Sequence, residues 1–413
     1  MTLRRSLAPL RLADFRAYWA GRTISLVGNA LAPVAVAFAV LHLGGDAGSL
    51  GLVLAARGVP QALLLLFGGV VSDRYPRQRV LVVACVVSGL VQTVAAGALL
   101  GGVATIGVLA AVEAIQGAVS AFTMPALSGV VPLVVPREQW QQANALTSAG
   151  RTGAVMLGPA VGGAVVATAG PGWGLAVDAA TFLVAAGCYT RLRLPAAARP
   201  PESSTLADLR AGWDEFRSRT WLWVVVLAFF ALNALFAGAW LTLGPVVANG
   251  TVGAAGWGLA LAAMAVGMLL GTIAVVRFSW EHPLRAAMTG ALLIALPIAA
   301  LGLSPSLPVL MLAGAVGGFG LDLFAVTWET AMQEQIPTDK LSRVFAYDML
   351  GSILAVPAGQ VVIGAAAQAF TPRPVVLTAA ALYVAIAMLA LFTPAVWGLR
   401  RHAAARPLAV EAT

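Results

Sequence analysis

Charged residues are scarce in this chain. Asp, Glu, Lys and Arg together make up 10% of the 413 residues, whereas hydrophobic residues make up 60%, and the mean hydropathy is +0.89. Because soluble domains carry about 25% charged residues, this composition excludes the soluble classes. It predicts a polytopic membrane protein.

Residues that build catalytic or metal centres are equally few. The two cysteines, Cys85 and Cys188, fall inside long apolar runs, which excludes a disulfide framework and a zinc site. Histidines occur only at His42, His282 and His402, and no H-E-x-x-H, Walker A or G-x-S-x-G element is present. We therefore expect neither an enzyme nor a cofactor. Without a nucleotide-binding loop, ATP hydrolysis is also excluded as an energy source.

Long apolar runs dominate the sequence instead. A helix needs about 20 apolar residues to cross a bilayer, and these runs are long enough. Cutting the chain at polar and Gly/Pro clusters predicts an all-α integral membrane protein of twelve spans. They cover residues 17–42, 49–71, 80–100, 104–131, 143–168, 174–194, 221–248, 256–276, 284–303, 307–329, 343–368 and 375–398.

Arginines gather on one side of these spans. With a cytoplasmic N-terminus, the inner loops receive all of the loop arginines except Arg373. The positive-inside rule therefore places both termini in the cytoplasm. The net charge of +8 is then a topology signal, and we expect no nucleic-acid binding. A composition rich in Arg, Ala and Gly is typical of GC-rich genes, so we expect a bacterial cytoplasmic membrane.

One long hydrophilic loop divides the chain in two. We expect a six-helix bundle at 1–194, a cytoplasmic linker with an amphipathic helix at 195–220, and a second six-helix bundle with a cytoplasmic tail at 221–413. The linker could equally be a plain connection. The halves echo each other, VVPREQW in the first matching QIPTDKL in the second. Parallel repeats of this kind predict two bundles that rock about a site between them.

The loop between the second and third spans carries the strongest motif. Its sequence, GGVVSDRYPRQR, places Gly69, Asp73, Arg74 and Arg77 in a Gly-x-x-x-Asp-Arg-x-x-Arg pattern. This pattern resembles the helix 2–helix 3 signature of the major facilitator superfamily of secondary transporters. The resemblance implies a conformational latch, in which Asp73 meets the N-terminus of helix 11 in the outward-open state. Alternatively, the loop serves only as a topology anchor.

The fifth span resembles the antiporter motif of the same superfamily, g-x-x-x-G-P-x-x-G-G. The match lies at Gly158, Pro159, Gly162 and Gly163, with Ala154 in place of the first glycine. Small residues at this spacing let a helix approach its partner closely, and Pro159 kinks the helix. The motif is typical of exporters, although ordinary small-residue packing would give the same pattern.

Three longer segments resemble the drug:proton antiporter-3 branch, which includes macrolide efflux proteins and the enterobactin exporter. They lie at Leu10–Leu31, Met124–Leu146 and Gly170–Leu183. The resemblance implies the major facilitator fold, two pseudo-symmetric six-helix bundles. It also implies a central cavity lined by spans 1, 4, 7 and 10.

Ionisable residues inside spans are functional candidates, because each is costly in hydrocarbon. Glu113 in span 4 is the foremost, with Gln116 and Ser120 on the same helical face. Glu113 either couples protons to substrate or forms a permanent pair with Arg57 of span 2. Asp322 in span 10 is the second proton-site candidate.

Stripes of polar or aromatic residues on spans 1, 7 and 10 line the expected cavity or serve helix packing. They comprise Arg22, Ser25 and Asn29 in span 1, Asn233, Phe236 and Trp240 in span 7, and Phe319 in span 10. Three other buried charges have expected roles in packing or gating. Arg151 and Asp348 lie where the halves meet, and Asp178 we expect to cap or pair locally near the outer end of span 6.

These features predict proton-coupled efflux of amphipathic small molecules, such as drugs or antibiotics, by alternating access. Two alternatives stay open, a dedicated exporter of a siderophore or other metabolite, and a non-transporting membrane sensor. The expected partners are the substrate, protons and the lipid bilayer, with the protein acting as a monomer. With Glu113 and Asp322 facing the cavity, we expect neutral-to-cationic, lipophilic substrates.

Overall fold

The computed structural model describes residues 7–194, 217–278, 280–336 and 338–399. Every regular element in these ranges is helical, and the described residues contain twelve candidate membrane spans. Helices suit a bilayer because they satisfy the backbone N–H and C=O groups within one segment. The twelve spans expected from the sequence are confirmed. The segment 195–216, which holds most of the expected linker, and the tail 400–413 lie outside the described residues.

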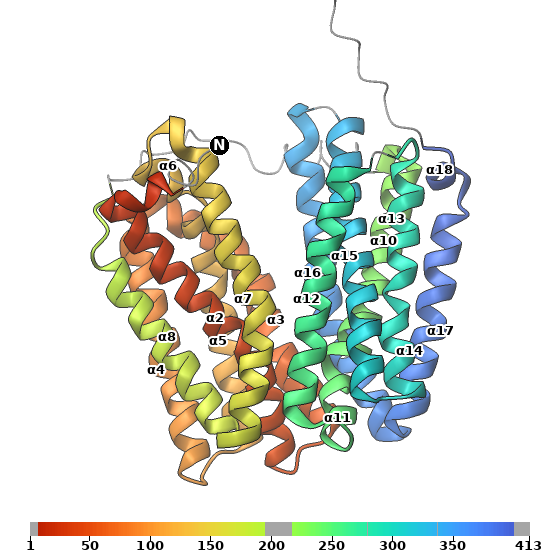
Figure 1. Ribbon diagram of the computed structural model, residues 1–413, viewed down its shortest axis with the longest axis horizontal. Helices are drawn as coiled ribbons and strands as arrows, with labels where there is room; N and C mark the ends of the chain where they lie inside the picture. Colours follow the sequence, from red (N-terminus) through yellow and green to blue (C-terminus); the bar gives the residue numbers. More distant parts are fainter. Residues whose placement is uncertain (1–6, 195–216, 279, 337, 400–413) are drawn as a thin grey trace, which may run out of the picture.

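The first bundle lies at the left of Figure 1 and contains the elements from η1 to α8. Its elements are η1 (Ala8–Arg11), α2 (Ala13–His42), α3 (Ala47–Arg74), α4 (Arg77–Leu100), α5 (Ile106–Ser128), α6 (Val131–Val134), η2 (Arg137–Gln139), α7 (Trp140–Ala169) and α8 (Pro171–Tyr189).

The second bundle lies at the right of Figure 1. Its elements are α10 (Thr220–Phe236), η3 (Ala237–Thr242), α11 (Leu243–Asn249), α12 (Gly253–Arg277), α13 (Pro283–Leu293), α14 (Ala295–Leu303), α15 (Leu307–Gln335), α16 (Thr338–Ala369), α17 (Pro372–Leu391) and α18 (Pro394–Trp397). One span runs through α10, the π-helical η3 and α11, and another through α13 and α14.

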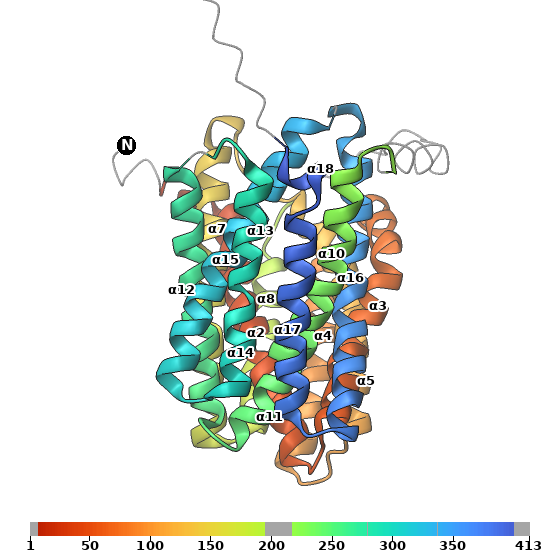
Figure 2. The same cartoon turned by 90° about the vertical axis from the view of Figure 1, so that its right-hand side faces the viewer.

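The two bundles converge at one end. Figure 1 shows them leaning together where α11 lies and standing apart where α6 and α18 lie. The view in Figure 2 shows that the long helices of both bundles run in roughly the same direction. We call these the α11 end and the α6/α18 end. Helix pairs α3–α16 and α7–α12 join the bundles.

The α7–α12 contact, which we call the first seam, brings backbone against backbone. A Cβ atom on Gly163 of α7 would lie 2.4 Å from the carbonyl oxygen of Ala254, and one on Gly258 of α12 would lie 2.3 Å from that of Pro159. No side chain fits at either position. The close approach expected from the antiporter motif is therefore present, and its partner is a helix of the opposite bundle.

The α3–α16 contact, the second seam, is built in the same way. A Cβ on Gly51 would lie 2.2 Å from the carbonyl oxygen of Gln360, and one on Gly364 would lie 2.8 Å from that of Ala47. Together the two seams close the space between the bundles toward the α11 end.

A polar contact at the α11 end reinforces the second seam. The Asp46 carboxylate caps α3 by accepting from the Ser49 amide at 2.8 Å and also accepts from the Gln368 side chain of α16 at 2.7 Å. Chiefly because of the Ser49 amide, the pKa of Asp46 lies below its usual range. A group of this kind loses its charge only as the pH falls through that lowered pKa. Between about pH 5 and pH 8 Asp46 therefore stays ionised and keeps both contacts.

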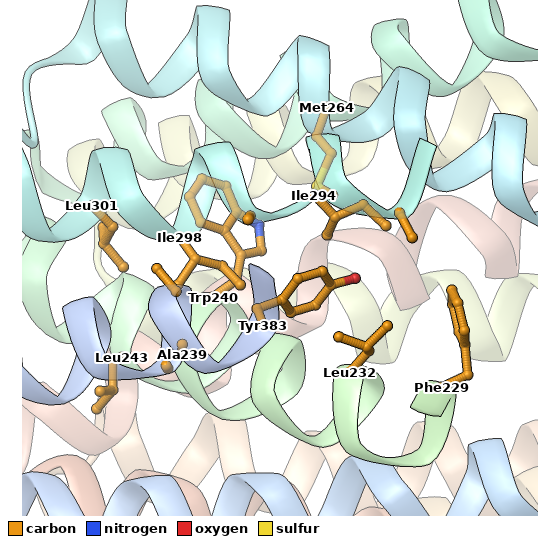
Figure 3. Close-up of a cluster of buried hydrophobic side chains, with 14 of the residues drawn as sticks. Phe229, Leu232, Ala239, Trp240, Leu243, Met264, Ile294, Ile298, Leu301 and Tyr383 are labelled. Atoms are coloured by element: carbon orange, nitrogen blue, oxygen red, sulfur yellow. The ribbon is translucent and has the colours of Figure 1, made fainter. Parts of the chain in front are cut away.

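The second bundle has an apolar and aromatic interior. Figure 3 shows Trp240 and Tyr383 among Leu232, Ile294 and Ile298. The Trp240 ring is fully buried and packs against Trp257 with 4.7 Å between ring centroids. This aromatic contact holds η3 against α12.

We expect Gly163→Ala to open the first seam. Its new Cβ would meet the Ala254 carbonyl, and overpacking of this kind costs about 1–3 kcal/mol. Spin labels at the exposed residues Thr168 and Thr251 should therefore report longer distances across the α11 end. Gly153→Ala in the same helix is the matched control, because a Cβ there meets nothing within 4 Å. Identical distance distributions in both variants would contradict this account of the seam.

Candidate functional site

A cavity of about 280 Å³ lies between the two bundles. Among the described residues that line it, Arg57 is the only charged one, and Gln61 and Gln360 are polar neighbours. The other lining residues are Pro33, Val34, Leu54, Gly58, Leu241, Pro245, Trp257, Leu261 and Val356. An apolar wall with a few convergent polar groups is the usual composition of a small-molecule site.

The Arg57 guanidinium links this cavity to the interior of the first bundle. Its Nη1 lies 3.4 Å from Glu113 Oε2, and its Nη2 donates to Asn29 Oδ1 at 3.1 Å. The Arg57 side chain is 30% exposed, whereas that of Glu113 is only 4% exposed. The pairing that the sequence left open is therefore formed in this conformation. Glu113 lies behind Arg57 and does not line the cavity.

Close contact between α3 and α5 makes the pair possible. A Cβ on Gly117 would lie 1.9 Å from the carbonyl oxygen of Arg57, so only glycine fits there. Because Gly117 is one turn beyond Glu113, it brings the two helices together at the level where the arginine must reach the carboxylate. Ser120, one turn further on, donates to the Gln116 carbonyl of its own helix at 2.8 Å.

A second buried acid lies behind the pair. Gln116 donates to the Ser88 carbonyl at 3.2 Å and to Gln92 Oε1 at 3.3 Å, and Gln92 donates to Asp178 Oδ2 at 2.9 Å. Asp178 is 2% exposed, and Arg57 and Glu113 both act on it electrostatically. Asp178 therefore has a side-chain partner on α4, and within its own helix the Thr181 hydroxyl donates to its backbone carbonyl at 2.7 Å.

The two acids retain free acceptor capacity. Glu113 Oε1 and Asp178 Oδ1 are both buried and have no hydrogen-bond partner in the described part of the chain. We call Asn29, Arg57, Glu113, Gln92, Gln116 and Asp178 the polar cluster. It contains two carboxyl groups and one guanidinium, so the addition of one proton would make it electrically neutral.

The stripe on the first span leads toward this cluster. Asn29 donates to the Ser25 carbonyl at 3.0 Å, and Ser25 donates to the Arg22 carbonyl at 3.1 Å. Arg22 itself donates to the Tyr18 hydroxyl. The structure thus places Asn29 beside the cavity and Arg22 two turns away, toward the α6/α18 end.

Candidates in the second bundle lie elsewhere. Asp322 accepts from Thr272 across the α15–α12 contact and is not among the residues that line the central cavity. Trp240 is fully buried, while Asn233, Phe236 and Phe319 are half-buried. Trp257, which the sequence analysis did not single out, is the aromatic residue of the cavity wall.

The motif loop anchors helix ends. A Cβ on Gly129 would lie 1.0 Å from Nη1 of Arg77, so the guanidinium covers the C-terminus of α5, where a helix dipole favours a cation. Gln78 donates to the carbonyls of Tyr189 and Thr190 at the end of α8. These contacts fit the topology anchor. The surroundings of Gly69 and of the Asp73 side chain are outside what the structure describes, so the latch stays a prediction. Arg74 is exposed.

The remaining motif residues pack between helices. A Cβ on Gly158 would lie 2.4 Å from Ala30 Cβ of α2, and one on Gly162 would lie 2.9 Å from Leu31 Cβ. Arg151 is exposed on α7, whereas Asp348 is half-buried on α16 with Trp328 as its hydrogen-bond partner.

Sequence reasoning missed Gln92, although its depth along the span could have placed it beside Asp178 and Glu113. Asp178 lies seven residues after Pro171, Glu113 seven after Ile106, and Gln92 eight before Leu100. Because these three ends all lie at the α11 end, the side chains occur at one level of the bundle. Polar residues at equal depth in spans 3, 4 and 6 could therefore have been grouped from the sequence.

Comparisons with known proteins agree with this architecture. The chain is 27% identical over 371 residues to the multidrug efflux pump Tap of Mycolicibacterium fortuitum, covering 84% of this chain and 88% of that protein. It is 31% identical over 200 residues to the enterobactin exporter EntS of Salmonella paratyphi A, covering 48% of each.

Solved structures show the same fold. The nucleoside transporter NupG matches with a TM-score of 0.72 at 14% identity, covering 92% of this chain and 99% of that one. A bacterial homologue of the human lysosomal transporter Spinster, inward-facing and unoccupied, matches with a TM-score of 0.69 at 16% identity, covering 98% of this chain and 100% of that one.

The family comparison covers most of the chain. The sequence profile of the Major Facilitator Superfamily matches residues 18–352. With twelve spans, two bundles and a cavity between them, this multi-pass membrane protein belongs to a superfamily of transporters, not of enzymes. The chain is a member of the Major Facilitator Superfamily.

Proposed function

We propose that this protein exports amphipathic small molecules in exchange for protons, by alternating access. One observation carries the proposal: Arg57 lines the cavity between the bundles and also pairs with a buried acid. A proton taken up by the polar cluster and a substrate in the cavity would therefore act on the same guanidinium. The likeness to Tap, a multidrug efflux pump, and to EntS, an enterobactin exporter, supports the direction of export.

Helix α3 offers a route from the proton to the conformational change. It carries Gly51 of the second seam and Arg57 of the polar cluster, six residues or about 9 Å apart along the helix. Protonation of Glu113 or Asp178 would weaken their hold on Arg57. A shift of α3 that follows would act directly on the α3–α16 contact. No cofactor is needed, and one chain holds a complete cavity, so we propose a monomer driven by the proton gradient.

Export of one dedicated metabolite or siderophore is the second candidate. The likeness to EntS, which covers 48% of the chain, favours this candidate. The compound that accumulates inside a deletion strain would distinguish the two. A non-transporting sensor is the third candidate, and it predicts that gradient-dependent flux is absent. A compound panel assayed in proteoliposomes under an imposed pH gradient tests the proposal, and the absence of flux for every compound would contradict it.

We expect Glu113→Gln to abolish gradient-driven efflux while the protein still folds. Glutamine keeps the shape and can still contact Arg57, but it cannot exchange a proton. Internal pyranine fluorescence would follow proton movement during transport. Thr123→Val on the same helix is the control, because the Thr123 hydroxyl only donates to the Val119 carbonyl. Unchanged proton-coupled flux in the Glu113 variant would exclude this residue as the coupling site.

We expect Arg57→Gln to lower the thermal stability more than the double variant Arg57→Gln/Glu113→Gln does. Removal of the guanidinium alone leaves the buried Glu113 carboxylate without its cation, and breaking a buried pair costs about 3–5 kcal/mol. Removal of both charges relieves most of that cost. The measurement is thermal unfolding in detergent at neutral pH. Equal losses of thermal stability in the single and double variants would show that Arg57 does not stabilise the buried Glu113 carboxylate.

A further inference from the structure

A second polar pocket lies in the first bundle, toward the α6/α18 end. It has a volume of about 280 Å³ and is lined by α2, the end of α5, α6 and α7. We call this pocket the vestibule, and its polar lining includes Tyr18, Arg22, Ser128, Asn144, Ser148 and Arg151. Two of these residues are arginines, and none of the described residues that line the pocket is acidic.

The vestibule contains hydrogen-bond donors that can bind a ligand. Arg22 donates to the Tyr18 hydroxyl, but its Nε is buried and has no hydrogen-bond partner among the described residues. On α7, Asn144, Ser148 and Arg151 recur at i, i+4 and i+7, which places them on one helical face, and all three are exposed. An arginine offers five N–H donors in a planar fork that matches a carboxylate or a phosphate.

The same stripe continues to the central cavity. Asn29 is seven residues beyond Arg22 on α2, or about 10 Å along the helix, and it holds the Arg57 guanidinium. Arginines therefore occur at both levels, Arg22 and Arg151 in the vestibule and Arg57 in the cavity wall. Glu113 lies behind Arg57, and Asp322 lines neither space.

A larger cavity, of about 420 Å³ between α3, α4 and α5, lacks these features. Apart from Arg79 and Tyr75, it is lined by aliphatic side chains and Phe122. It offers one cation and no convergent set of donors, so it does not share the charge pattern of the vestibule and the central cavity.

We propose that the vestibule binds the anionic group of an amphipathic substrate, a carboxylate or a phosphate, before the substrate passes to Arg57. This inference rests on the proposed transport function and names its substrate class. It reverses the preference for cations expected from the sequence, because that expectation placed Glu113 and Asp322 in the cavity wall. A pocket of this size holds an anionic head group, and the apolar part of the substrate extends beyond it.

Binding of a matched probe pair tests the proposal. Pyrenebutyrate and its neutral amide share one apolar scaffold and differ in charge. In nanodiscs of phosphatidylcholine, we expect the wild-type protein to bind the carboxylate about tenfold more tightly than the amide, as charge-assisted hydrogen bonds predict. Equal affinities, or no carboxylate binding, would overturn the proposal.

Charge variants locate the site. Arg22→Gln and Arg151→Gln should each weaken carboxylate binding roughly five- to tenfold and change amide binding less than about twofold. Arg22→Lys should retain part of the carboxylate affinity, which a purely structural role for Arg22 would not predict. Arg16→Gln is the control, because Arg16 is exposed on the same helix and lies outside the vestibule. Thermal unfolding of each variant identifies any loss of binding that comes from misfolding.

Two further arms separate the possible outcomes. Nanodiscs containing phosphatidylglycerol show whether a lipid head group competes for the vestibule: competition that disappears in Arg22→Gln would assign the site to lipid and overturn its role in substrate capture. Because binding needs no gradient, failure of proton coupling in proteoliposomes would contradict the proposed function and leave selective carboxylate binding intact. An equal loss of carboxylate and amide binding in both arginine variants would overturn the inference itself.

Discussion

Backbone contact across two glycine seams determines how the bundles are arranged. At Gly163 and Gly258 on one side, and Gly51 and Gly364 on the other, any side chain would meet a carbonyl oxygen of the opposite bundle. Such contacts gain dispersion energy without locking side chains together. They bring α3 and α7 against the second bundle at the α11 end. The seams therefore close the cavity from that end, and the contact can separate again as two rigid surfaces.

The two bundles divide the chemistry unequally. The first contains the buried acids Glu113 and Asp178, whereas the second packs Trp240 and Trp257 in an apolar interior. Buried charges need partners nearby, and the glutamines of α4 and α5 supply hydrogen bonds that lipid cannot. An apolar bundle needs no such network and can move as a unit. In the proposed cycle, this asymmetry would assign the protonation step to the first bundle and a mainly mechanical role to the second.

Arg57 connects these parts because of where it lies. Its guanidinium contacts Glu113 and Asn29 within the first bundle, yet it also forms part of the cavity wall. A long, permanently charged side chain can cover this distance, and its planar donors can serve two acceptors at once. The same property makes arginine suited to an anionic substrate. The guanidinium thus faces the cavity, and the two acids that offset its charge lie on the protein side.

The sequence by itself determined the twelve spans and the close packing of the fifth span, because hydrophobic length and small-residue spacing are local properties of the chain. It named Arg57 as a partner for Glu113 only as one of two alternatives, and the structure forms that pair. The sequence did not find Gln92, the partner of Asp178 on α4, and it assigned Trp240 to the cavity wall. Only the tertiary structure decided these points, since rotation about a helix axis determines which way a side chain points. In an apolar membrane helix no clear polar face reveals that rotation, and packing against neighbours fixes it.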